Sequence, residues 1–68
     1  MPDSQIAQIK ALEESARQLI QQAAGMREVA SNTEEQKLRE TLLKSADECE
    51  EAARNLLKGL RGMRESLQ

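Results

Sequence analysis

Apolar residues recur at alternating steps of three and four in two stretches of this chain, with a short polar segment between them. In the first stretch, counted as a heptad abcdefg, the a positions hold Ile9, Ala16, Ala23 and Ala30, and the d positions hold Leu12, Leu19 and Met26. Ile6 and Ile20 widen the stripe at position e. This period is typical of an amphipathic helix packed along a seam. It predicts a helix over about residues 4–30, capped by Asp3 or Ser4.

The second stretch continues the same repeat and is slightly longer. Its a positions hold Ala46, Ala53, Leu60 and Leu67, and its d positions hold Leu42, Cys49, Leu56 and Met63. Leu43 and Leu57 again widen the stripe at position e. The pattern predicts a second helix over about residues 34–66.

The polar segment between the stretches reads as a tight turn. Ser, Asn and Thr side chains bond to nearby backbone and favour turns and caps, which places the connection at about residues 31–33. The alternative is a first helix that stops at Gly25 and a longer loop, but Met26 and Ala30 keep the heptad in phase. Thr33 and Gln36 have the spacing of a capping box, with Thr33 as the N-cap of the second helix. A connection this short makes the two helices antiparallel, so residues 1–68 form one helical-hairpin domain of the all-α class.

The apolar stripes are too wide for two helices to cover, so the sequence predicts self-association. A chain of 68 residues has little room for a core, and one cysteine with no histidine offers neither an internal disulfide nor an evident zinc site. We expect a homodimeric four-helix bundle, or a higher oligomer of hairpins. Its expected core is formed by Leu12, Ala16, Leu19, Ala23, Met26, Leu42, Ala46, Cys49, Ala53, Leu56, Leu60 and Met63.

Composition and charge exclude several classes of function. Ten basic and twelve acidic residues give a net charge of -2, so we expect neither nucleic acid nor an anionic membrane as a partner. No apolar run approaches the ~20 residues that a membrane span needs. The first residues lack the basic and apolar regions of a signal peptide, and a lone cysteine fits a reducing compartment. Together these features indicate a cytoplasmic protein.

Catalytic chemistry is poorly represented. There is no histidine for acid–base work, and Cys49 falls at a core d position, where a thiol without a cationic neighbour is inert. Four carboxylates surround that cysteine: Asp47, Glu48, Glu50 and Glu51. Consecutive helical positions spread around the axis, so we interpret them as a solvated face rather than a cation site, with a basic partner as the alternative. We therefore expect no enzyme activity, no cofactor and no metal.

Basic residues gather toward the end of the second helix, which is expected to extend past the first by about a turn. They match the helix dipole, and they also form the predicted partner-binding surface, which comprises Arg54, Lys58, Arg61, Arg64 and Leu67. The exposed face near the turn is a second candidate surface. Elsewhere the charges form i,i+4 pairs, such as Glu13 with Arg17 and Glu50 with Arg54.

The length, the two-helix layout and the alternation of Ala at a with Leu at d resemble the Rop-type hairpins. Locally, Glu40-Thr41-Leu42 followed by Ala46-Asp47-Glu48 resembles the second helix of that family. The resemblance implies a dimeric four-helix bundle that binds paired RNA loops. The family binds RNA through basic and aromatic residues of its first helix, whereas here that helix has no aromatic residue and carries few basic ones. The architecture is therefore the only property that we carry over.

These observations favour a small regulatory or adaptor protein that self-associates and binds a partner protein. Two alternatives stay open. One is a Rop-like RNA-binding regulator, and the other is an oligomer that sequesters a small anionic ligand between hairpins.

Overall fold

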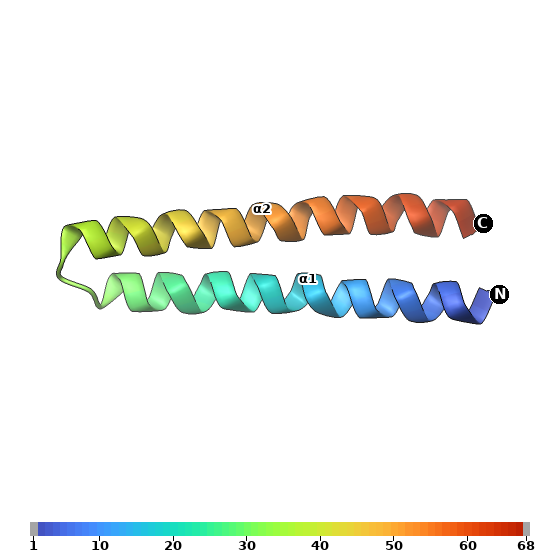
Figure 1. Cartoon of the computed structure of the whole chain (residues 1–68), viewed down its shortest axis with the longest axis horizontal. Helices are drawn as coiled ribbons and strands as arrows, with labels where there is room; N and C mark the ends of the chain where they lie inside the picture. The colour runs from blue at the N-terminus through green and yellow to red at the C-terminus, as the bar shows by residue number, and fades with distance from the viewer. Residues whose placement is uncertain (1, 68) are drawn as a thin grey trace.

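The computed structural model describes the backbone of residues 2–67 and the side chains of residues 4–66. Two helices, α1 (Pro2–Ser31) and α2 (Gln36–Leu67), lie side by side along their whole length and run antiparallel (Figure 1). The rod measures 51 × 15 × 11 Å. The all-α helical hairpin predicted from the heptad repeat is confirmed. We call the end that carries the connection the turn end and the end where both helix termini lie the open end.

The start of α1 and the end of α2 both differ from the predicted ones. α1 begins at Pro2 rather than near residue 4, because a proline fits the first turn, where its missing N–H has no intrahelical partner. Ser4 therefore lies inside the helix and does not cap it, and the side chain of Asp3, the other predicted cap, lies outside the described residues. The two helices end level at the open end, so the expected overhang of α2 is absent (Figure 1).

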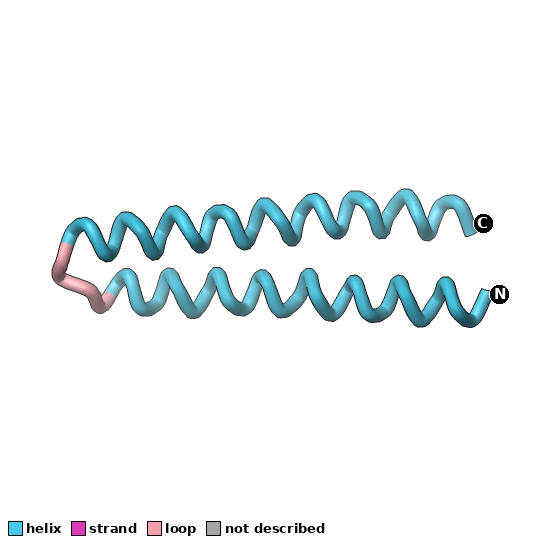
Figure 2. Tube along the Cα trace, viewed as in Figure 1, coloured by secondary structure: helices cyan, strands magenta, loops and turns pink. Residues whose placement is uncertain are grey.

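The connection comprises residues 32–35, drawn as the short loop in Figure 2. The predicted capping role of Thr33 is wrong, because its hydroxyl donates to the carbonyl of Val29 at 2.6 Å and so satisfies the end of α1. The first helical bond of α2 runs from the amide of Arg39 to the carbonyl of Glu35, so Glu35 takes the N-cap position. Asn32 supports the end of α1 as well, donating from its side-chain amide to the carbonyl of Glu28 at 3.1 Å.

Small side chains form the seam between the helices. Seven a residues are buried, at 0–5% exposure: Ile9, Ala16, Ala23, Ala30, Ala46, Ala53 and Leu60. Because alanine projects so little, the backbones can approach closely along the middle of the hairpin. No side chain larger than alanine falls below 2% exposure among the described residues.

Large apolar side chains lie beside the seam rather than inside it. The d residues are half-buried: Leu12, Leu19, Met26, Leu42, Cys49, Leu56 and Met63. Six others are 40–55% exposed: Ile6, Ile20, Val29, Leu38, Leu43 and Leu57. The hairpin therefore leaves most of its large apolar side chains at least partly exposed to solvent.

Candidate functional site

The hairpin has two broad faces of different chemistry. With the a residues in the seam, the d and g residues of both helices lie on one side and the e and b residues on the other. The contacts agree with this division, because Arg27 pairs with Glu50 and Arg64 pairs with Glu13, all four at e positions. We call the d and g side the uncharged face and the e and b side the charged face.

Interhelical ion pairs replace two of the predicted pairs within a helix. Glu13 pairs with Arg64 instead of Arg17, and Glu50 pairs with Arg27 instead of Arg54. The physical reason is the e position, which places these carboxylates beside the opposite helix rather than facing solvent.

Arg27 and Arg17 each form one further ion pair. Arg27 also holds Asp47, with Nη2 2.7 Å from Oδ1, so a single guanidinium bridges two carboxylates of α2. Arg17 pairs one turn back with Glu14, at 3.0 Å.

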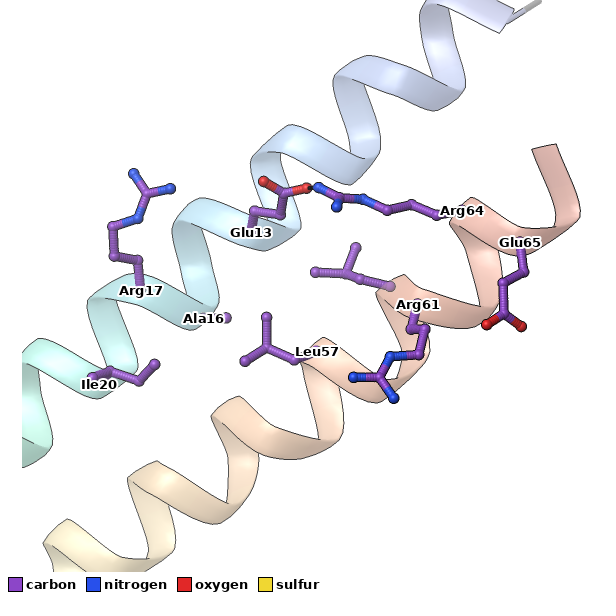
Figure 3. Close-up of a pocket in the computed structure, with 9 residues that line it drawn as sticks. Glu13, Ala16, Arg17, Ile20, Leu57, Arg61, Arg64 and Glu65 are labelled. Carbon is purple, nitrogen blue, oxygen red and sulfur yellow. Dashed lines mark ion pairs between the residues drawn. The ribbon is translucent and has the colours of Figure 1, made fainter. Parts of the chain in front are cut away.

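An open groove of about 540 Å³ lies on the charged face toward the open end (Figure 3). Glu13 and Arg64 point toward each other across it, and Leu57 points toward α1. Its floor is apolar and its rim is charged, and it is lined by Glu13, Ala16, Arg17, Ile20, Leu57, Leu60, Arg61, Arg64 and Glu65.

The predicted partner-binding residues divide around this groove. Arg61 and Arg64 line it, whereas Arg54 and Lys58 do not. The side chain of Leu67 lies outside the described residues. Sequence reasoning missed the contribution of α1, which adds Arg17 to the rim. The antiparallel pairing could have revealed it, because it brings the start of α1 beside the end of α2.

Charge is unevenly distributed along the charged face. Among the described side chains, Glu13 lies in the open-end half with four basic residues, namely Lys10, Arg54, Arg61 and Arg64, and Arg17 lies next to the midpoint. At its turn-end half, Arg27 lies among three acidic residues, namely Glu40, Asp47 and Glu50. The groove thus lies in the basic half.

The uncharged face is continuous from end to end. From Gln5 to Ser66, no d or g position within the two helices holds a charged residue; besides the d residues, this face carries Gln8, Ser15, Gln22, Val29, Leu38, Ser45, Ala52, Gly59 and Ser66.

The two ends of the uncharged face differ in shape. At the turn end, Val29 and Leu38 stand 55% and 48% exposed, and we call them the turn-end knob. At the open end, a hollow of about 240 Å³ is lined by Gln5, Gln8, Ile9, Met63 and Ser66, and we call it the open-end hollow.

The described residues hold no cluster of three or more side chains suited to bind a metal ion. Two members of the acidic group around Cys49, Asp47 and Glu50, are occupied by Arg27. Cys49 is half-buried and forms no disulfide. Neither helix is long and apolar enough to cross a membrane over the residues described.

Comparison with known proteins gives no assignment. No family model matches the chain, and no match was found among curated proteins or solved structures.

Proposed function

We propose that this protein is a small non-enzymatic helical hairpin that self-associates as a four-helix bundle and acts as a regulatory or adaptor module by binding a partner protein. The single cysteine fits a reducing compartment such as the cytoplasm.

The composition of the seam carries the proposal of self-association. A hairpin that fully buries mainly alanines gains little hydrophobic free energy, because each alanine removes little apolar area from water. Its half-buried leucines and methionines gain the rest only when another surface covers them. Small scaffolds without disulfides or metals usually meet this need by oligomerisation.

The size of the uncharged face is sufficient for a stable dimer. A face of 51 by 15 Å has a projected area of about 750 Å², and each partner of a standard interface buries about 800 Å². A second hairpin laid over this face would therefore complete one common core.

The mass in solution tests self-association. We expect light scattering, with refractive-index detection because the chain has no Trp or Tyr, to give twice 7.6 kDa across a concentration series. A folded monomer at all concentrations would refute self-association.

The basic half of the charged face supports the proposal of a partner protein. Its groove offers an apolar floor, Ile20 and Leu57, beside the guanidinium groups of Arg61 and of Arg17 and Arg64, whose pairs with Glu14 and Glu13 are exposed to solvent. This combination suits an acidic amphipathic segment of a partner, since the arginine stems pack on apolar groups while their heads pair with carboxylates.

Charge reversal in the groove tests partner binding. We expect the double variant Arg61→Glu/Arg64→Glu to lose proteins that the wild-type chain retains from a cell extract. The matched control Lys37→Glu/Lys44→Glu makes the same change in net charge at positions outside the groove and should retain them. Equal retention by both variants would exclude the groove as the binding surface.

A further inference from the structure

We infer that two copies pack through their uncharged faces with their turns at opposite ends, so that the turn-end knob of each copy enters the open-end hollow of the other. This inference rests on the proposed self-association and adds which face is covered and in which direction the partner copy runs.

The distribution of charge indicates which face of the hairpin the second copy covers. Covering the charged face would remove Arg27, Glu50, Arg64 and Glu13 from water, and desolvating such ion pairs is costly. The uncharged face carries no ionised side chain at its d and g positions from Gln5 to Ser66. A second copy therefore covers it without burying a charge.

The shapes of the two ends of the uncharged face indicate the direction in which the second copy runs. The midpoint of α1 falls between Ala16 and Arg17, and that of α2 between Glu51 and Ala52. A two-fold axis through these midpoints, running across the helices, places Val29 at the level of residue 4 of the other copy and Leu38 at the level of residue 65. The open-end hollow lies at these levels, between Gln5 and Ser66.

If both turns lay at the same end, similar surfaces of the two copies would face each other. With both turns at the same end, the exposed Val29 and Leu38 of one copy meet those of the other, and the two hollows face each other. Such an arrangement leaves voids at one end and crowding at the other, and both lower stability.

The residues between the ends favour the same direction. With opposed turns, Leu42 lies near the level of Gly59 of the other copy, and Leu56 lies near the level of its Ser45. With turns together, Leu42 lies instead at the level of Met26, so large residues oppose large ones. Facing positions that alternate between large and small interdigitate better.

This arrangement has a consequence for partner binding. Each charged face stays on the outside of the bundle, and the two grooves lie on opposite outer faces near opposite ends. The dimer therefore presents two separated docking sites rather than one joint site.

Inter-copy distances between spin labels distinguish the arrangements. A nitroxide is attached to Glu34→Cys in a Cys49→Ser background; Glu34 is exposed and lies in the connection. Opposed turns predict a label-to-label distance of about 50 Å, close to the 51 Å length of the rod, and adjacent turns predict one well under half that length. A short distance overturns the inference but leaves self-association intact. No dipolar signal, together with a monomer mass for both this variant and the wild-type chain, overturns self-association itself.

A control label checks that the signal comes from the dimer. Glu51 is exposed and lies beside the midpoint of α2, so a label on Glu51→Cys lies close to its copy in either arrangement. It should give a short distance whichever way the turns point.

Two leucines test the covered face without any label. Leu38→Ala removes half of the knob and is expected to raise the dimer dissociation constant about tenfold or more. Leu43→Ala removes the same side chain from the charged face, where Leu43 is 40% exposed against 48% for Leu38, and is expected to leave the constant nearly unchanged. The reverse order would place the interface on the charged face and overturn the inference.

Discussion

Alanine at the a positions determines which partners the neighbouring e and d residues can contact. Because Ala16, Ala23, Ala46 and Ala53 let the helices approach closely, the e residues of one helix reach those of the other. Glu13 and Glu50 therefore bond across the hairpin rather than along their own helix. The d residues, on the opposite side of the seam, are left half-covered and available to a second copy.

The ion pairs of Arg27 should contribute modestly to the stability of the protein. Its guanidinium bridges Glu50 and Asp47, but the side chain is 42% exposed, so solvent screens the pairs. We expect Arg27→Ala to lower the free energy of unfolding by about 0.5–1 kcal/mol, and by less in 1 M salt. Urea denaturation followed by circular dichroism measures this. Arg17→Ala, which removes an exposed pair within α1, should cost less; an equal loss would contradict the bridging role.

Cys49 provides a second residue-scale prediction. It lies on the uncharged face close to the middle of α2, so opposed turns bring the two Cys49 side chains near the two-fold axis. We expect mild oxidation to yield a covalent dimer on a non-reducing gel. Cys49→Ser should yield none, and the absence of a dimer band from oxidised wild-type protein would contradict this placement.

Each helix is a regular element whose ends are determined by local hydrogen bonds. Thr33, Asn32 and Ser31 all donate to carbonyls of the last turn of α1, which extends the connection to residues 32–35. α2 contains Gly59 and Gly62, although neither has a positive φ and an added Cβ would meet nothing within 4 Å in the hairpin. Within one hairpin, these glycines only weaken the helix.

The two glycines provide a prediction at the element scale. Gly62 lies at a c position, on the edge of the rod, so Gly62→Ala should raise the free energy of unfolding by about 1 kcal/mol through helix propensity. Gly59 lies on the uncharged face, and the proposed dimer places it near the level of Leu42 of the second copy. Gly59→Ala should therefore gain less than Gly62→Ala or destabilise the dimer. Thermal unfolding at equal concentration compares them, and equal gains would indicate that Gly59 faces solvent in the dimer.

The whole molecule is a thin rod with a small core of its own. Its buried positions hold alanines with Ile9 and Leu60 near the open end, and six large apolar side chains are at least 40% exposed. Folding and association should therefore be one coupled process, as in obligate dimers that have no stable folded monomer.

This coupling gives a prediction for the intact protein. We expect the Tm to rise steadily with protein concentration, because mass action favours the dimer. Circular dichroism melts over a hundredfold range of concentration measure the effect. A Tm independent of concentration, with a reversible transition, would mean that one hairpin folds alone.

The two helices, their antiparallel pairing and the small residues of the seam could all be predicted from the heptad repeat. A heptad repeat identifies buried positions without knowledge of the partner helix, because the period of the helix alone places the a residues on one line. The buried residues Ala16, Ala23, Ala46 and Ala53 were all found in this way.

The division of the remaining surface into a charged and an uncharged face depends on how the two helices pack. The bonds of Glu13 to Arg64 and Glu50 to Arg27 join residues far apart in the chain, whereas sequence spacing could suggest only partners within one helix. The groove that joins Arg17 to Arg61 and the knob formed by Val29 and Leu38 likewise require both helices in register. Local periodicity places residues around one axis, and contacts between two axes depend on how close the helices lie and on which residues share a level.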